Sequence, residues 1–306
     1  MNRHLVLAEP VRAALEAGRA VLALESTILA HGMPWPKNLE TARWAEQAAR
    51  DAGATPATIA ILDGQLRVGL ADAQLEQLAR LGPGAVKCSR RDIPFLLREG
   101  GNGATTVAAT VIVAALAGIR VLATGGIGGV HRGAETSMDV SADLEELART
   151  RVAVVCAGPK SILDLGLTLE YLETQGVPVI GYRTDELPAF YTRESGFGVD
   201  YRLDSAAEIA TVLETKWALG LDGGVVVANP IPGIAALEYE NMEHFIARAL
   251  VDAREARVSG KALTPWLLQR VEELSGGESL VANVELMLNN ARLGAEIAVA
   301  LAGADG

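Results

Sequence analysis

Short apolar runs alternate along the chain with longer segments whose apolar residues recur at helical spacing. The short runs predict strands, and Asp63-Gly64 predicts a hairpin turn into residues 65–68. Strands are expected at residues 20–24, 58–62, 85–88, 121–124, 152–156, 178–182 and 224–228. Helices are expected at residues 11–17, 38–52, 72–81, 93–99, 142–150, 162–174, 205–219, 242–257, 265–274 and 280–301, and in an Ala-rich segment that Thr105 or Thr106 caps and that ends at Ala117.

Strands that alternate with helices predict an α/β fold, namely a three-layer α/β/α arrangement around a mainly parallel central sheet. The chain has 306 residues, 50% of them hydrophobic, and no break in composition, so we expect one domain over residues 1–306. Aromatic residues make up only 4%, so Ala, Val, Leu and Ile must fill the interior. Residues 183–204 are polar and interrupted by Pro188 and two glycines, which predicts a long surface excursion.

The formal net charge of −11 argues against nucleic acid or an anionic membrane as the main partner, but permits a small phosphorylated substrate held by a few local cations. Residues 1–10 contain His4 and Glu9 and do not resemble a signal peptide. The longest apolar run, residues 107–119, is shorter than the ~20 residues of a membrane span and predicts a buried helix. Cys88 and Cys156 are expected to be reduced, buried thiols of a cytoplasmic protein.

A glycine-rich stretch, residues 121–143, is the clearest candidate for a ligand site. An apolar run is followed by Gly125-Gly126 and Gly128-Gly129, and Ser141 can then cap a helix. Glycine admits a close ligand and free N–H groups at a helix start attract anions, although a tight turn explains the pattern equally well. The third glycine of the dinucleotide fingerprint and a Gly-Lys-Ser/Thr phosphate loop are both missing, so the stretch suggests a phosphate-sized ligand without naming it.

Polar residues at the ends of several predicted strands should converge on one rim of the sheet, because parallel strands present their carboxyl ends to the same edge. These residues are Glu25, Lys87, Thr124, Lys160 and Asn229. Lys160 is expected one or two residues before a helix, where a cation costs about 0.3–1 kcal/mol. It would either hold a phosphate or act as a neutral amine that forms a Schiff base, unless it is a solvated loop lysine. Glu25 is a proton donor if burial raises its pKa, and otherwise a capping or loop carboxylate.

Other charged and amide residues allow a functional and a structural interpretation. Lys87 and the neighbouring Arg90 and Arg91 could contact a phosphate, or one of the arginines pairs with Asp92. The set His131, Asp139 and Asp143 would suit Mg²⁺ or Mn²⁺, although Asp143 is also explained by helix capping. We expect Arg132 to balance Glu135, and a solvated face for the three asparagines on or near the last helix: Asn283, Asn289 and Asn290.

With these residues assembled, the sequence resembles the pseudouridine-5′-phosphate glycosidases, in order and over nearly the whole chain. The matching blocks are Ala-Leu-Glu-Ser-Thr-Ile (23–28), His-Gly-Met-Pro (31–34), Pro-Ala-Thr-Ile-Ala (56–60), Ser-Arg-Arg-Asp (89–92), Asn-Gly-Ala-Thr-Thr-Val (102–107), Ala-Thr-Gly-Gly-Ile-Gly-Gly-Val-His-Arg-Gly (123–133), Val-Cys-Ala-Gly-Pro-Lys-Ser-Ile-Leu-Asp (155–164), residues 224–232 and Pro-Trp-Leu (265–267). Cys88 departs slightly from the family pattern, which often has Val there.

The resemblance implies reversible cleavage of pseudouridine 5′-phosphate to uracil and ribose 5-phosphate with a divalent metal, usually Mn²⁺, by a homotrimer. It implies that Glu25 is the proton donor and Lys160 the nucleophile, and that Asp139 is the metal ligand. The implied substrate-binding residues are Lys87, Val107, Ser141, Ala142 and Asp143, with Thr124, His131 and Asn283 near the phosphate or sugar.

A lysine nucleophile suits this reaction, because the departing base of a C-glycoside leaves through carbon and its cleavage needs electronic assistance at C1′. A covalent adduct of Lys160 at C1′ would supply that assistance. Two other functions stay open at this point. A sugar-phosphate or nucleoside kinase would need an ATP site, for which no motif is present. A non-catalytic sensor of ribose phosphates gives no reason for both Glu25 and Lys160.

Overall fold

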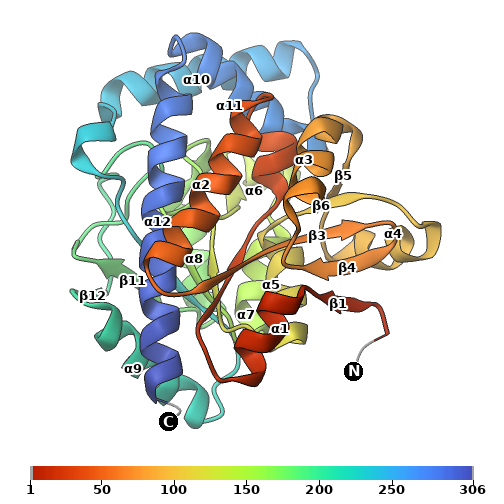
Figure 1. The fold of residues 1–306 in the computed structure, drawn as a ribbon. Helices are drawn as coiled ribbons and strands as arrows, with labels where there is room; N and C mark the ends of the chain where they lie inside the picture. The colour runs from red at the N-terminus through yellow and green to blue at the C-terminus, as the bar shows by residue number, and fades with distance from the viewer. Residues whose placement is uncertain (1–2, 305–306) are drawn as a thin grey trace.

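The computed structural model describes residues 3–304, in which eleven strands form a central sheet (Figure 1). The order along the sheet is β1-β4-β3-β2-β7-β9-β13-β11-β12, with β6 beside β3 and β5 beside β6. Their bounds are β1 Leu5–Leu7, β2 Val21–Leu24, β3 Thr55–Leu62, β4 Gln65–Val68, β5 Val86–Cys88, β6 Gly103–Thr105, β7 Val121–Ala123, β9 Ala153–Cys156, β11 Val179–Tyr182, β12 Tyr201–Leu203 and β13 Val225–Ala228.

The sheet is mainly parallel, as the sequence predicts. Antiparallel pairing occurs where β3 meets β4, through the predicted hairpin, and where β3 meets β6. The central strands β2, β7, β9 and β13 are buried along their full length, because helices cover both of their faces. A separate pair, β8 (Val130–His131) with β10 (Leu163–Asp164), is antiparallel and lies outside the main sheet.

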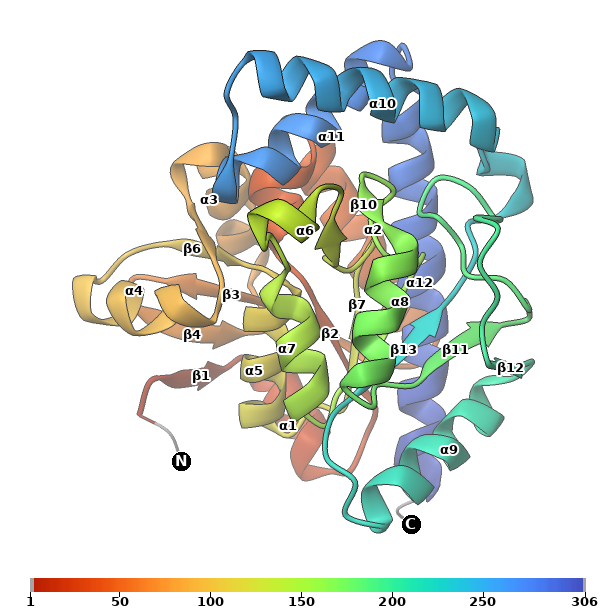
Figure 2. The same ribbon diagram turned by 180° about the vertical axis from the view of Figure 1, so that it is seen from behind.

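Helices cover the two faces of the sheet and confirm the three-layer α/β/α prediction (Figures 1 and 2). One face carries α2 (Lys37–Asp51), α9 (Ala206–Ala218) and α12 (Glu278–Ala304), whose buried side chains form one core cluster with the strands. The other face carries α1 (Glu9–Glu16), α5 (Val107–Ala117), α7 (Ala142–Arg149) and α8 (Leu165–Thr174), packed in a second cluster.

Two further groups of elements shape the upper end of the molecule. The helices α10 (Tyr239–Glu255) and α11 (Leu263–Leu274), with the 3₁₀ turn η5 (Gly260–Ala262), form a cap that lies above the sheet in Figure 2. A lobe made of β4, β6 and α4 (Ile93–Glu99) projects from the side of the molecule (Figure 1), and α3 (Asp72–Leu81) lies at its base.

One strand is absent from the prediction and one predicted boundary is wrong, because both depend on short pairings. The unpredicted strand is β6, whose Gly103 pairs with both Val86 and Ile61. The helix predicted from residue 162 begins at Leu165, because Leu163 and Asp164 first pair with β8. The Asp164 side chain then caps α8 by accepting a hydrogen bond from the amide of Leu167.

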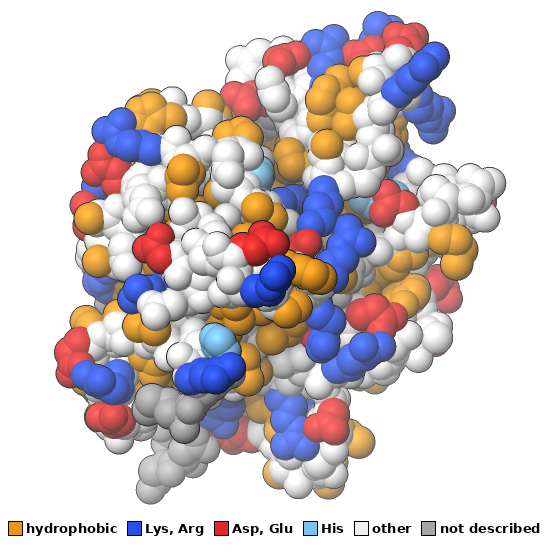
Figure 3. All heavy atoms as spheres, turned by 90° about the vertical axis from the view of Figure 1, so that its right-hand side faces the viewer, with side chains coloured by type: hydrophobic (Ala, Val, Ile, Leu, Met, Phe, Trp, Pro, Cys, Tyr) orange, Lys and Arg blue, Asp and Glu red, His pale blue; other side chains and the backbone are white. Residues whose placement is uncertain are grey.

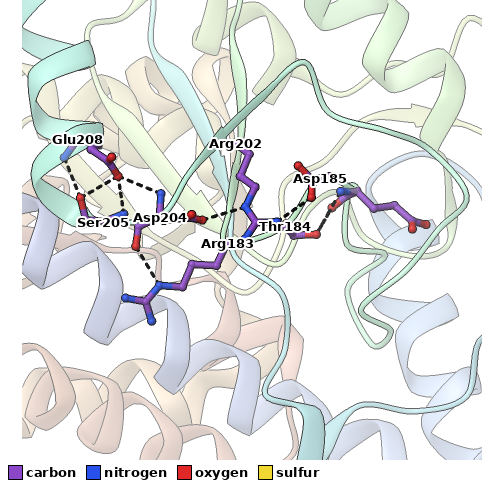
Figure 4. Close-up of polar contacts among 8 residues, drawn as sticks. Arg183, Thr184, Asp185, Arg202, Asp204, Ser205 and Glu208 are labelled. Atoms are coloured by element: carbon purple, nitrogen blue, oxygen red, sulfur yellow. Dashed lines mark hydrogen bonds and ion pairs between the residues drawn. The ribbon is translucent and has the colours of Figure 1, made fainter.

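The segment 183–204 is only in part the surface excursion that its polar composition predicts, because residues 187–192 are buried. Leu187, Phe190 and Tyr191 are buried, and the amide of Phe190 donates to the carbonyl of Ala157 at 2.9 Å. Figure 4 shows how polar contacts close the base of this segment: Arg202 pairs with Asp185 and Asp204, and Arg183 donates to the Asp204 carbonyl. The buried residues Leu187, Phe190 and Tyr191 therefore hold the middle of this segment against the rest of the fold.

Both cysteines are free and buried, as predicted, and burial raises the pKa of each thiol to about 12. In residues 3–304, none of the helices combines the length and the apolar character that crossing a bilayer requires.

Candidate active site

A cavity of ≈ 460 Å³ opens beyond the carboxyl end of β2, whose neighbours are β3 on one side and β7 on the other. This is where the strand order reverses, the usual ligand position in open α/β sheets. All the catalytic, substrate-binding and metal residues that the resemblance implies line this cavity: Glu25, Lys87, Val107, Thr124, His131, Asp139, Ser141, Ala142, Asp143, Lys160 and Asn283. The predicted convergence of strand ends is therefore confirmed for Glu25, Lys87, Thr124 and Lys160, whereas Asn229 does not line the cavity.

Glu25 follows β2 directly and is only 9% exposed. The hydroxyl of Thr124, at the end of neighbouring β7, donates to its carboxylate. Burial raises the pKa of Glu25, and this effect outweighs the opposing attraction of the Lys160 cation and the hydrogen bonds from Thr124 and Thr27. The side chain thus favours the protonated form that a proton donor needs.

Lys160 enters the cavity from the loop after β9. Its amide donates to the Ile127 carbonyl at 3.0 Å, and Nζ donates to the Gly126 carbonyl at 2.6 Å. The prediction that Lys160 stands one or two residues before a helix is wrong, because α8 begins only at Leu165. Its position is set by pairing with the glycine-rich stretch and not by a helix terminus.

The glycine-rich stretch forms the floor of the cavity, and its glycines are explained by close approach. A Cβ on Gly126 would lie 2.6 Å from the Phe190 ring, and one on Gly128 would lie 2.2 Å from the Ser141 hydroxyl. Ser141 caps α7 by accepting from the amide of Asp143 at 3.2 Å. Glycine therefore lets the loop lie directly against the start of this helix.

Asp143 joins three elements around the cavity. Its two carboxylate oxygens accept hydrogen bonds, each of 2.8 Å, from the amides of Ala108 in α5 and Gly128 in the loop. The first residues of α5 and α7, Val107 and Ala142, consequently face the same space. Two converging helix N-termini make a favourable environment for an anion.

Basic side chains lie along one side of the cavity. Burial, reinforced by the charge of Lys160, lowers the pKa of Lys87. The predicted pairing of Asp92 with a neighbouring arginine is wrong for Arg90, which forms an ion pair with Glu146, while Asp92 pairs with Lys261 of the cap at 2.5 Å. Lys and Arg side chains gather near the middle of the face shown in Figure 3, although the molecule as a whole is acidic.

Of the predicted metal set, only His131 and Asp139 have side chains that remain available for a metal. His131 and Asp139 both line the cavity, and the His131 amide donates to the Asp139 carbonyl at 3.0 Å. Burial lowers the pKa of His131 against the attraction of Asp139, so a neutral ring is favoured. Asp143 is already engaged by two backbone amides. Across the described part of the chain, no three His, Cys, Asp or Glu side chains are grouped to hold a metal.

The expected solvated face for the asparagines of the last helix is wrong. Asn290 is fully buried and donates to the carbonyls of Thr124 and Gly125, at 2.8 and 3.3 Å. Asn229, after β13, donates to the Asn290 side-chain oxygen at 3.0 Å. Asn283 lies about two turns earlier on the same face of α12 and is buried in the cavity wall. The amides thus satisfy backbone groups that the glycine-rich turn leaves open.

Sequence reasoning gave no site role to Phe190, or to Thr264, Pro265 and Leu268 of the cap, which complete the cavity wall. Their residue types are ordinary for a core or a helix, so only their place in space assigns them to the site. Arg132 was expected to pair with Glu135, but it forms a bidentate ion pair with Glu243 of α10.

Comparison with known proteins assigns the chain to a family. Residues 10–300 match the family described as indigoidine synthase A like protein. The pseudouridine-5′-phosphate glycosidases of Hahella chejuensis and Geobacillus kaustophilus are 58% and 59% identical to the chain over 298 residues, which are 97% of this chain and 98% and 99% of theirs. The chain belongs to the pseudouridine-5′-phosphate glycosidase family. Membership identifies it as an enzyme and confirms the resemblance seen in its motifs.

Two solved structures are similar to this glycosidase family member over its whole length. Prealnumycin C-glycosynthase AlnA, crystallised with ribulose 5-phosphate, superimposes with a TM-score of 0.91 at 42% identity, covering 100% of this chain and 99% of its own. An indigoidine synthase A-like protein from Thermotoga maritima gives 0.88 at 36%, covering 99% and 98%. A C-glycosynthase with a bound sugar phosphate shares the fold of this glycosidase.

Proposed function

We propose that this protein cleaves the C–C glycosidic bond of pseudouridine 5′-phosphate, reversibly, to give uracil and ribose 5-phosphate. The observation that supports this most directly is the meeting of Glu25, whose pKa is raised by burial, with the amine of Lys160 in one cavity. The names of the relatives and the sugar phosphate bound to AlnA agree with this substrate class.

In the proposed reaction, Glu25 gives its proton to the ring oxygen as the C1′–O4′ bond breaks, and the Lys160 nitrogen bonds to C1′. The new ammonium at Lys160 loses a proton to the Glu25 carboxylate, and the freed nitrogen lone pair forms a C=N bond while the C1′–C5 electron pair passes to the uracil ring. The proton held by Glu25 is then transferred to C5 of the uracil. Water adds to the resulting iminium and releases ribose 5-phosphate and free Lys160. Before the first step, Nζ must leave the Gly126 carbonyl, which it contacts in the structure.

The binding residues follow from the electrostatics of the cavity. The 5′-phosphate would lie near Lys87 and the backbone N–H groups at the starts of α5 and α7, contributed by Val107, Ser141, Ala142 and Asp143. Thr124, His131 and Asn283 would contact the sugar or the phosphate. Burial disfavours the charged form of Lys87, and the negative charge of a bound phosphate would offset this effect.

A divalent cation, Mn²⁺ or a similar hard ion, would be held by Asp139. One carboxylate suits ions of this kind when they keep several waters and also contact substrate phosphates. When bound, the ion would neutralise part of the phosphate charge. A homotrimer, which the family resemblance implies, and a cytoplasmic location, which the two free cysteines favour, belong to the same proposal. Sedimentation of the purified protein would test the trimer.

The function is tested by incubating the protein with pseudouridine 5′-phosphate and Mn²⁺ and following uracil release. Borohydride reduction in the presence of ribose 5-phosphate should leave a covalent adduct on Lys160, and Lys160→Ala should release no uracil and form no adduct. An adduct that persists in Lys160→Ala would refute the assigned nucleophile. Binding of ribose 5-phosphate without uracil release would indicate a sensor, and ATP consumption a kinase.

The metal assignment has its own test. Asp139→Ala should stay folded, because its side chain supports no described core contact, but it should lose Mn²⁺-dependent activity by about 10- to 100-fold. Chelator-treated wild-type protein should show a similar loss that added Mn²⁺ reverses. Full activity of Asp139→Ala in chelator-treated buffer would make the residue structural.

A further inference from the structure

Arg132, directly after β8, uses its guanidinium to hold two separate parts of the chain. Nε donates to the Leu163 carbonyl at 3.2 Å, and Nη2 donates to the Ser161 carbonyl at 3.1 Å. The same group binds the Glu243 carboxylate in bidentate fashion, with Nη1 and Nη2 at 3.0 and 2.8 Å from its oxygens. One side chain therefore satisfies four acceptors.

The two carbonyls belong to the segment that carries Lys160. This segment is pinned at its ends, where the Lys160 amide donates to the Ile127 carbonyl and Leu163 pairs with His131 in the β8–β10 pair. Between these points the chain makes a turn, and Arg132 binds the outward carbonyls of that turn. A lysine at position 132 would lack the planar fork that reaches both carbonyls and a carboxylate.

Glu243 links the same guanidinium to the cap. It lies on α10 beside Met242, which is buried in the core together with Ile246 of the same helix. The position of Glu243 is consequently fixed by packing, and α11, which follows in the cap, supplies part of the cavity wall. Arg132 thus connects the Lys160 segment to the elements that close the cavity.

From these contacts we infer that Arg132 is a positioning residue for Lys160, an inference that rests on the proposed function. The Arg132–Glu243 pair is 28% and 33% exposed, so it contributes little to global stability. Its effect is local: it fixes the turn from which Lys160 must reach C1′. A misplacement of about 1 Å at such a site can slow a reaction by roughly 100-fold.

The test compares Arg132→Ala, Arg132→Lys and Glu243→Gln with wild type. Borohydride trapping with saturating ribose 5-phosphate should slow by about 10- to 100-fold in Arg132→Ala. The KM for pseudouridine 5′-phosphate should change much less, and the melting temperature should stay close to that of wild type. Arg132→Lys and Glu243→Gln should be intermediate. Millimolar guanidinium should partly restore Arg132→Ala, because it can occupy the vacated site.

Hydrogen exchange supplies a readout that does not depend on the reaction. The amides of residues 160–164 should exchange faster in Arg132→Ala, whereas those of the central strands should not change. The matched control is Arg43→Ala, which removes a bidentate pair with Asp72 that joins α2 to α3 and does not line the cavity. It should leave both trapping and exchange of residues 160–164 unchanged.

The outcomes separate the two proposals. Wild-type trapping rates in Arg132→Ala would overturn the positioning role, and so would an equal loss in Arg43→Ala. If wild-type protein itself forms no adduct, the lysine step of the proposed function fails. Hydrogen exchange then decides the positioning role alone: faster exchange in residues 160–164 supports it, and unchanged exchange overturns it.

Discussion

At Glu25, the burial that catalysis requires lowers the stability of the fold at neutral pH. Desolvation raises its pKa, so the folded state favours the neutral acid and resists its ionisation. A group of this kind stabilises the fold fully below its unfolded pKa, and that stability is lost as the pH rises through its folded pKa. A neutral replacement of the same shape avoids this cost.

Glu25→Gln should therefore abolish most of the activity, by about 100- to 10,000-fold, and yet raise the melting temperature at neutral pH. The gain in unfolding free energy should shrink as the pH falls toward 4.5, by at most about 1.4 kcal/mol per pH unit. Thermal unfolding at several pH values measures it, with exposed Glu16→Gln as the control. A stability difference that is constant with pH would contradict the raised pKa.

At the scale of single residues, the sequence indicated the reactive groups better than their supports. Glu25 and Thr124 could be predicted because each directly follows an apolar strand, and Lys160 because it lies in the loop after another one. Asn290 could not, because its partners are carbonyls 165 and 166 residues away in sequence. The periodicity of a helix gives no sign of a partner on another element.

The glycine-rich loop and the start of α7 act as one unit at the scale of elements. Gly128 lies where a Cβ would meet Ser141 at 2.2 Å and the Asp143 carboxylate at 2.8 Å. A methyl group there must push the loop away from the helix start. The two hydrogen bonds of Asp143 that join the loop to α5 would be disturbed together.

Gly128→Ala should therefore destabilise the protein by about 1–3 kcal/mol, as overpacking typically does, and weaken substrate binding. Gly233→Ala is the matched control, since a Cβ there meets nothing within 4 Å. Urea unfolding and the KM for pseudouridine 5′-phosphate would measure both effects. Equal unfolding free energies and equal KM values for the two variants would show that the loop accommodates the methyl group without destabilisation.

Long elements were predictable and short ones were not, for a physical reason. The strands β2, β9 and β13 are continuous apolar runs, and the helices around them are long enough to show a helical period in the sequence. The pair β8–β10 has two residues on each side, too few for any period, yet it determines where Lys160 points. The segment 183–204 was misjudged because its three large buried side chains are outnumbered by polar neighbours.

At the scale of the whole molecule, the basic side chains at the cavity have the opposite sign to the net charge of the protein. The net charge of −11 repels a phosphate dianion at long range, so the basic side chains along the cavity must overcome that field locally. Lys261 is the member of this group that the cap contributes, and its pairing with Asp92 joins the cap to the residue that precedes α4 of the lobe. It therefore acts both on the local potential and on the position of the cap.

Lys261→Met should lower kcat/KM for the phosphorylated substrate by about three- to tenfold at low ionic strength, mainly through KM. The difference from wild type should narrow as salt rises, because the Debye length falls to about 8 Å at 0.15 M. The melting temperature should change little, since the pair is partly exposed. Lys37→Met removes a comparable pair with Glu40 outside the cavity and should leave kcat/KM unchanged at every salt concentration. A loss in Lys261→Met that persists undiminished at high salt would assign Lys261 to cap geometry and not to the field.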